Sequence, residues 1–203
     1  MSVAFVFPGQ GSQSIGMLGA LASQYDDVQR VFESASKRLG YDLWALTQSG
    51  PEERLNATEC TQPAMLAAGV ATWRIWQRRG GPAPDLVAGH SLGEFTALAV
   101  AGVLDPDDAV ELVRFRGQVM QEAVPRGEGG MAAIIGLDDA EVEAACAEAA
   151  QGQVVEAVNY NAPSQVVIAG ATAAVERAIA AAKARGAKRG LPLPVSAPFH
   201  SSL

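Results

Sequence analysis

The most constraining feature of the sequence is a serine set between two glycines where a predicted strand meets a predicted helix. Residues 85–88 have the composition of a buried strand, and the helix-compatible residues 94–101 follow the segment Gly89-His90-Ser91-Leu92-Gly93. A sharp turn of this kind leaves no room for side chains beside the serine, which explains the flanking glycines. The pattern therefore favours an α/β fold in which Ser91 lies at the end of a strand.

The N-terminal part of the sequence predicts a second strand and two long helices. Residues 3–7 form an apolar run typical of a buried parallel strand. The run ends at Pro8-Gly9-Gln10-Gly11-Ser12, which matches neither a dinucleotide fingerprint nor a Walker loop. Apolar residues at helical spacing predict a helix over residues 28–39. A second helix is expected to start at its N-cap Thr61, with Pro63 in its first turn, and to end at Gly80. Its tryptophans, Trp73 and Trp76, are expected in the core.

The second half of the sequence has a different order of elements. We predict strands at 131–135, 154–159, 165–169 and 191–195, and helices at 138–150 and 172–185. This β-α-β-β-α-β order matches the ferredoxin-like unit. We therefore expect a small ferredoxin-like subdomain, residues 126–197, inserted into a larger α/β-hydrolase-like body with a parallel sheet, residues 1–125 and 198–203.

Composition excludes several classes of protein. The 203 residues, 49% of them hydrophobic, are enough to bury a core within one large domain or two small ones. A net charge of −7 disfavours nucleic-acid binding. No apolar run is long enough for a membrane span or a signal peptide, so we expect no membrane association and a cytoplasmic location. Cys60 and Cys146 lie far apart without metal-ligand spacing, which predicts reduced thiols and no metal site.

Ser91 has the surroundings expected of a nucleophile, because the start of the following helix directs free N–H groups toward it. A serine hydroxyl needs a general base, and the sequence contains two histidines. His90 is expected to pack beneath the turn, since adjacent side chains diverge. His200, after the last predicted strand, is therefore the favoured base. An ordinary glycine-rich turn remains the structural alternative.

An arginine lies on the apolar face of the predicted helix 106–124. Leu112 and Met120 help to mark this face, and Arg116 lies four residues from each, so Arg116 is expected to point inward and Arg114 is not. A guanidinium on an inward face needs an anion, and its planar fork suits a carboxylate. Either a protein Asp or Glu or a substrate would supply that carboxylate.

Four motifs together resemble the malonyl-CoA:acyl-carrier-protein transacylases and the acyltransferase domains of fatty-acid and polyketide synthases. They occur in the order and approximate spacing of that family: residues 7–13 (Phe-Pro-Gly-Gln-Gly-Ser-Gln), residues 89–94 (Gly-His-Ser-Leu-Gly-Glu), Arg116-Gly117 and Pro198-Phe199-His200. The resemblance covers essentially the whole chain. It implies transfer of a malonyl group from malonyl-CoA to the phosphopantetheine thiol of acyl carrier protein in fatty acid biosynthesis, without a metal or other cofactor.

The resemblance also implies a role for individual residues in this transfer. Ser91 would carry the malonyl group as an ester, and His200 would be the base. The backbone N–H groups of Gln10 and Leu92 would form the oxyanion hole.

Three further residues would contact the substrate if the resemblance holds. Arg116 would hold the malonyl carboxylate, and Met120, one helical turn further, would line the same pocket. Phe199 resembles the residue that precedes the histidine in malonyl-selecting members of the family rather than in methylmalonyl-selecting ones.

Members of this family continue well beyond the catalytic histidine, whereas this chain ends at Leu203. A glutamine that orients the histidine in relatives would be absent. We therefore expect this polypeptide alone to be a fragment with weak or no activity unless a second piece completes it, and with exposed strand edges.

Two other functions stay open. The first is a serine hydrolase or thioesterase of the α/β-hydrolase type, which needs an acid between the serine and the histidine; Asp138, Asp139 and Glu156 are candidates. The second is a noncatalytic module that binds a carrier protein.

Overall fold

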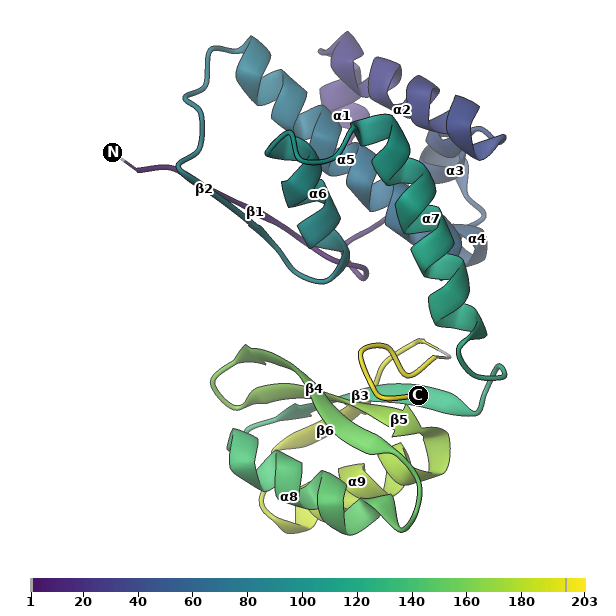
Figure 1. The fold of residues 1–203 in the computed structure, drawn as a ribbon, viewed down its shortest axis with the longest axis vertical. Helices are drawn as coiled ribbons and strands as arrows, with labels where there is room; N and C mark the ends of the chain where they lie inside the picture. Colours follow the sequence, from purple (N-terminus) through teal and green to yellow (C-terminus); the bar gives the residue numbers. More distant parts are fainter. Residues whose placement is uncertain (1, 196) are drawn as a thin grey trace. The chain divides into compact units, whose positions relative to one another are not determined.

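The computed structural model describes residues 2–195 and 197–203, and the chain divides into two compact units, Met1–Gln118 and Val119–Leu203 (Figure 1). Each unit has its own hydrophobic core. The division differs from the expected one, which placed the boundary at residues 125 and 126. It also groups residues 198–203 with the second unit, because this segment packs on the antiparallel sheet there.

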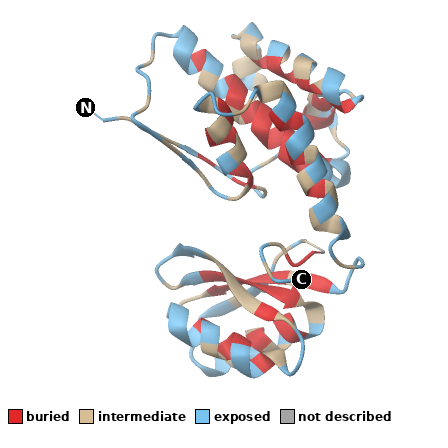
Figure 2. Ribbon diagram, in the orientation of Figure 1, coloured by how far each residue is buried: buried red, intermediate tan, exposed pale blue. Residues whose placement is uncertain are grey.

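The first unit is mainly helical and is built around one long helix. Its elements are β1 (Ala4–Phe7), α1 (Gly19–Ala22), α2 (Asp26–Leu39), α3 (Leu43–Ser49), α4 (Glu52–Asn56), α5 (Thr58–Arg78), β2 (Leu86–Gly89), α6 (Leu92–Val100) and α7 (Pro106–Glu122), whose residues from Val119 on belong to the second unit. Buried residues line α5 on nearly all sides over its first four turns, as Figure 2 shows. A helix that is apolar all round is stable only when other helices surround it. Accordingly, α2, α6 and α7 contribute buried residues to the same core.

The two strands of the first unit pair in parallel, with Phe7 opposite Gly89. The expectation that both strands are buried was wrong: Val6 is 78% exposed and Leu86 is 69% exposed. In the described part of the chain each strand has one neighbour, so its other edge is uncovered. Burial of an apolar strand depends on such neighbours and not on the strand's own composition.

Helix α5 begins earlier than its capping pattern predicts. It starts at Thr58, so Thr61 lies inside it, where the Thr61 hydroxyl donates to the carbonyl oxygens of Leu55 and Ala57. Pro63 consequently lies beyond the first turn. The expected burial of the tryptophans is also corrected, because Trp73 is half-buried and Trp76 is exposed.

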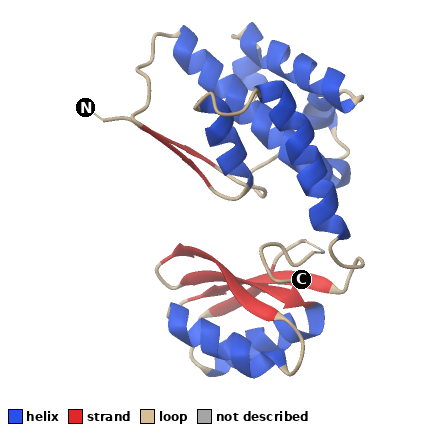
Figure 3. Ribbon diagram, in the orientation of Figure 1, coloured by secondary structure: helices blue, strands red, loops and turns tan. Residues whose placement is uncertain are grey.

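The second unit is an antiparallel sheet with two helices on one face (Figure 3). Its elements are β3 (Gly129–Ile135), α8 (Asp139–Ala150), β4 (Val155–Ala162), β5 (Gln165–Ala171), α9 (Thr172–Ala184) and β6 (Arg189–Pro192). The strand order is β4-β5-β3-β6, and all three pairings are antiparallel. Together with the parallel pair of the first unit, this arrangement confirms the α/β class.

The last strand is shorter and earlier than predicted. It ends at Pro192, and Leu193, Val195 and Phe199 turn onto the sheet face opposite the helices. This segment leaves the ladder because its apolar side chains cover Met131, Ala133, Val167 and Ala169. Among the described residues, no helix is long and apolar enough to cross a membrane.

Candidate active site

The turn at Ser91 has the sharp geometry that the flanking glycines predict. Ser91 has φ 52° and ψ −108°, and α6 begins at the next residue. A Cβ on Gly89 would overlap the backbone of Gly93, and one on Gly93 would overlap the carbonyl oxygen of Phe7. Only glycine fits at both positions, so the backbone closes tightly beneath Ser91 and leaves its side chain at the end of β2.

The glycine-rich loop after β1 lies directly against this turn. A Cβ on Gly9 would come within 2.8 Å of the His90 carbonyl oxygen. The next residue, Gln10, is anchored from the other side, since its Nε2 donates to Thr58 Oγ1 at 3.3 Å. The structure thus brings the loop that carries Gln10 to the turn that carries Leu92. Leu92 opens α6, and first-turn amides have no acceptor within their own helix.

His90 lies differently from the expectation that it packs beneath the turn. Its side chain is exposed, and its Nδ1 lies 3.1 Å from the place of a Cβ on Gly9. The backbone N–H of His90 donates to the carbonyl of Phe7 at 3.1 Å, which extends the pairing of β1 and β2. The neighbouring loop therefore takes up the space beside this imidazole.

Arg116 points inward, as predicted, and reaches Ser91. Its Nη2 donates to Ser91 Oγ at 3.0 Å and its Nη1 donates to Gln62 Oε1 at 2.9 Å. The guanidinium carbon also lies 5.4 Å from the centre of the Phe95 ring, within cation–π range. Burial lowers the pKa of Arg116, while the negative charge of Glu94 opposes this shift. Among the described ion pairs none involves Arg116, so neutral acceptors occupy its fork.

The neighbour of Arg116 explains how α7 comes close enough to α5. A Cβ on Gly117 would lie 2.8 Å from the Cα of Glu59, so a side chain there would push the two helices apart. The buried residues of α7 are Ala109, Val110, Val113 and Gly117. Leu112 is exposed, which corrects the predicted position of the apolar face by about one residue.

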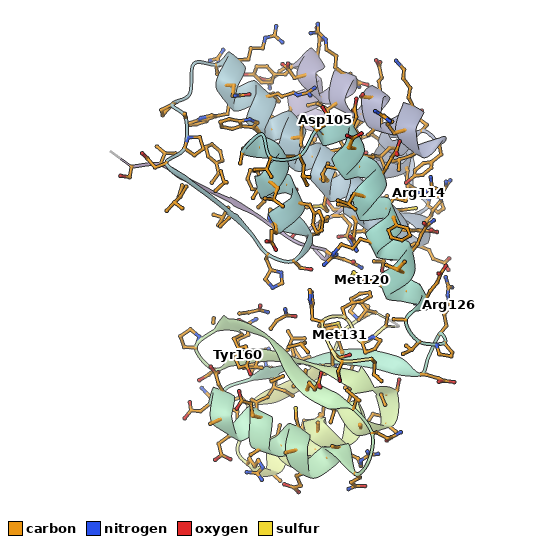
Figure 4. All side chains as sticks on the ribbon, in the orientation of Figure 1. Asp105, Arg114, Met120, Arg126, Met131 and Tyr160 are labelled. Atoms are coloured by element: carbon orange, nitrogen blue, oxygen red, sulfur yellow. The ribbon has the colours of Figure 1, made fainter. Side chains whose placement is uncertain are left out.

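Arg114 departs from the expectation that it points away from the core. It is half-buried, and its Nη1 donates to the carbonyl of Leu39, the last residue of α2, at 3.0 Å. A cation at this place stabilises the carbonyl end of a helix. Met120 follows Arg116 by one helical turn on α7 and is half-buried; Figure 4 labels Arg114 and Met120 on this helix.

His200 belongs to the second unit, where it occupies a tight turn. Its φ is 66°, and the turn is closed by Ser201, whose N–H and hydroxyl donate to the Pro198 carbonyl at 3.2 and 2.7 Å. Phe199, just before it, packs against an apolar cluster on the sheet face opposite the helices. This cluster includes Met131, which Figure 4 labels. The structure thus places Phe199 and His200 in one unit, and Ser91, Gln10, Leu92 and Arg116 in the other.

Gln62 is a site residue that sequence reasoning missed. It is 1% exposed in the second turn of α5, and its side-chain oxygen faces Arg116. A buried amide needs hydrogen-bonding partners, which the charged fork provides. The available signal was a single glutamine at the start of a long apolar run in residues 60–71. In the described part of the chain, no group of three or more His, Cys, Asp or Glu side chains is arranged to hold a metal ion.

A sharp turn that presents a serine between a strand and a helix is used by enzymes that carry an acyl group on that serine. The chain belongs to the acyl transferase domain family, whose sequence profile matches residues 4–202. It is 64% identical over 200 residues to the malonyl CoA-acyl carrier protein transacylase of Escherichia coli strain K12, a match covering 98% of this chain and 65% of the relative.

Solved structures show the same similarity. The acyl carrier protein S-malonyltransferase of Vibrio cholerae has a TM-score of 0.94 and 60% identity, covering 98% of this chain and 65% of that one. A type II PKS acyl-carrier protein in complex with its malonyl-transacylase gives a match with a TM-score of 0.96 and 61% identity, covering 98% of this chain and 64% of that chain. The chain therefore spans about 65% of the length of these relatives.

Proposed function

We propose that the chain provides the core of a malonyl-CoA:acyl-carrier-protein transacylase that serves fatty acid biosynthesis. Malonyl-CoA and acyl carrier protein are its proposed partners. The contact between Arg116 and Ser91 Oγ at 3.0 Å carries this proposal, because it places a cationic fork at the nucleophile of an acyl transferase. A fork at that position selects an acyl group with a free carboxylate, and the malonyl group has one.

In the first half-reaction, Ser91 Oγ attacks the thioester carbonyl of malonyl-CoA while His200 takes the hydroxyl proton. The backbone N–H groups of Gln10 and Leu92 stabilise the oxyanion of the tetrahedral intermediate. The carbon–sulfur bond then breaks, and His200 returns the proton to the departing CoA thiolate. The product is a malonyl ester on Ser91.

In the second half-reaction, the phosphopantetheine thiol of the carrier protein attacks the ester, and His200 takes the thiol proton. The same two donors stabilise the second oxyanion, and Ser91 Oγ leaves with the proton that His200 gives back. Neither half-reaction changes an oxidation state, so no redox cofactor is needed, and the proposal includes no metal because Ser91, His200 and the two backbone amides supply the nucleophile, the base and the oxyanion donors.

Arg116 is the proposed specificity residue. Its fork spans Ser91 and Gln62, which are both neutral. The malonyl carboxylate would replace Ser91 on Nη2 and gain a charge-assisted bond, while Gln62 keeps Nη1 in place. Met120 and Phe199 are proposed to line the acyl pocket, Met120 from the turn of α7 after Arg116 and Phe199 from the residue before His200.

The fold proposal is more specific than the α/β class. We propose that β3 to β6 form a ferredoxin-like subdomain and that β1, β2 and α6 belong to an α/β-hydrolase-like body. The strand order β4-β5-β3-β6 with both helices on one face supports the former. The parallel strands joined to α6 through the turn at Ser91 support the latter.

A cytoplasmic location is also part of the proposal. Cys60 and Cys146 are both buried free thiols, which suits a reducing compartment. Burial raises the pKa of the Cys146 thiol to about 11, so it stays protonated and unreactive at neutral pH.

The serine hydrolase alternative needs an acid for the histidine. Asp138 is the residue just before α8 and Asp139 opens that helix, while both Glu156 oxygens accept bonds from Ser202. The bonds of Glu156 go to Ser202 and not to a histidine, so the transacylase is the better-supported function.

The test is acylation of the chain by radiolabelled malonyl-CoA, with acid trapping and mapping of the label. We expect label on Ser91 and none in Ser91→Ala. Arg116→Ala should lower the rate of malonyl labelling about 100-fold and that of acetyl labelling only a few-fold, because a charge-assisted pair contributes about 1.5–3 kcal/mol. Arg114→Ala is the matched control, since it removes a half-buried arginine of the same helix that contacts Leu39 and not Ser91.

Two results would contradict the proposal. Equal losses of malonyl and acetyl labelling in Arg116→Ala would remove the specificity role. A folded wild-type chain that takes no label, even at high concentration, would instead favour an inactive fragment or a carrier-protein-binding module.

A further inference from the structure

The residues just after His200 are fixed to β4 by one carboxylate. The backbone N–H of Ser202 donates to Glu156 Oε2 at 2.8 Å, and the Ser202 hydroxyl donates to Glu156 Oε1 at 2.8 Å. The carboxylate therefore grips both the main chain and the side chain of one residue. Two charge-assisted bonds to adjacent groups restrain the direction of the backbone more than either bond alone.

The sheet directs Glu156 toward this segment. Glu156 on β4 pairs with Ala169 on β5, and paired residues in antiparallel strands project from the same face. Ala169 belongs to the apolar cluster against which Phe199 packs. Glu156 thus extends from the sheet face that the 193–199 segment covers.

The segment before His200 is anchored on the same sheet. A Cβ on Gly129 of β3 would overlap the ring of Pro198, so this glycine makes room for Pro198. Phe199 packs into the apolar cluster. His200 therefore lies in a turn held on its N-terminal side by Pro198 and Phe199, and on its C-terminal side by Ser202.

His200 is exposed and has a positive φ, a conformation that most residues avoid. Such a conformation persists when the surrounding structure holds it, and here the two sides of the turn are held by different elements. The contacts that hold Pro198 and Phe199 are apolar, whereas the pairing of Glu156 with Ser202 holds the turn through hydrogen bonds. Losing it would leave the turn fixed from one side.

We propose that Glu156 is a positioning residue that holds the His200 turn, and with it the imidazole, through Ser202. The inference rests on the proposed function of His200 as the base. It differs from a catalytic acid, because Glu156 acts on the backbone two residues away and not on the imidazole. Precise placement of a general base matters for rate, since proton transfer requires hydrogen-bond geometry.

The experiment compares Glu156→Gln, Glu156→Ala, Ser202→Ala and the double variant Glu156→Ala/Ser202→Ala in the full chain. Glu148→Gln is the matched control, because Glu148 is an exposed acid of the same unit that pairs with Arg185. The first readout is the ester-forming rate. We expect Glu156→Ala to lower the maximal rate of ester formation about tenfold, with the malonyl-CoA concentration that gives the half-maximal rate nearly unchanged. Glu156→Gln should lose less because the amide oxygen still accepts one bond, and the control should match wild type.

The second readout is the NMR spectrum of the imidazole nitrogens, which needs no activity. The chain has two histidines, so His90→Ala assigns both sets of signals. Glu156→Ala should shift or broaden the His200 signals and leave those of His90 in place. The double variant should equal Glu156→Ala in both readouts, because the two substitutions remove the same pairing.

The proposal is overturned if the Ser202 amide signal changes in Glu156→Ala while the His200 signals stay as in wild type. It is also overturned if wild type is labelled and Glu156→Ala is labelled at the same rate. If wild type takes no label, the proposed function fails, and the imidazole spectrum alone decides whether Glu156 positions His200.

Discussion

Arg116 shows how one side chain at the site is oriented by another. The buried side-chain oxygen Oε1 of Gln62 accepts a hydrogen bond from Arg116 Nη1, and the Phe95 ring lies against the guanidinium. A half-buried arginine has few ways to satisfy its donors, so removing one acceptor changes where the fork points. The specificity proposed for Arg116 therefore depends on Gln62.

We predict that Gln62→Leu lowers malonyl labelling of Ser91 about tenfold and acetyl labelling less than threefold. Leucine keeps the volume in the core but leaves Nη1 without its acceptor, which costs about 1–3 kcal/mol. Gln48→Leu is the control, because Gln48 is a half-buried amide of the same unit that donates to Met17 and does not contact Arg116. Labelling rates with the two acyl-CoAs check the prediction, and equal losses would exclude an orienting role.

At the scale of elements, the site depends on close backbone approaches that glycine permits. Gly89 and Gly93 let the turn close on itself, and Gly117 lets α7 approach α5. The contacts of Gly93 with Phe7 and of Gly117 with Glu59 join segments that are distant in sequence, so the position of Ser91 relative to Arg116 follows from helix packing as well as from the turn. A single added methyl group at such a point forces backbone to move.

Gly93→Ala should lower the unfolding free energy of the first unit by roughly 3 kcal/mol or more, because the new Cβ would overlap the Phe7 carbonyl oxygen. Urea unfolding followed by tryptophan fluorescence measures this unit, since Trp44, Trp73 and Trp76 all lie in it. Gly19→Ala is the control in the same unit: its Cβ would lie 3.3 Å from Gln48 Oε1, the end of a flexible side chain. A Gly93→Ala chain as stable as wild type would contradict the close approach.

At the scale of the whole molecule, the proposed catalytic groups are divided between two units with separate cores. The core of the first unit contains Leu66 among the helices, and that of the second contains Ile168 between the sheet and its two helices. Ser91 and Arg116 depend on the first core, and His200 depends on the second. Damage to either core should therefore act first on its own part of the site.

We predict that Leu66→Ala and Ile168→Ala each destabilise their own unit by about 2–5 kcal/mol, since both side chains are fully buried. Hydrogen exchange of the full chain, read by mass spectrometry, should show faster exchange in residues 2–118 for the first variant and in residues 119–203 for the second. Each variant serves as the control for the other. Faster exchange throughout the chain in both variants would show that the units unfold as one.

Local patterns predicted the elements well where a regular period or a special residue was present. The predicted elements between residues 131 and 185 agree with the structure to within two residues at nearly every end, because strand and helix periods differ strongly there. The sharp turn at Ser91 was predictable because only glycine fits beside it. The inward position of Arg116 was predicted from helical spacing, although Leu112, one of the residues used to mark the apolar face, is exposed.

Contacts between distant segments decided the rest. The exposure of Val6 and Leu86 reflects which neighbours each strand has, and the early end of β6 reflects the apolar face that the following segment covers. No local pattern indicates that Gln62 meets Arg116 or that Glu156 meets Ser202, since these pairs lie 54 and 46 residues apart. The amino-acid sequence by itself specifies short-range backbone geometry, whereas burial and the partners of polar groups are decided only when separate elements pack together.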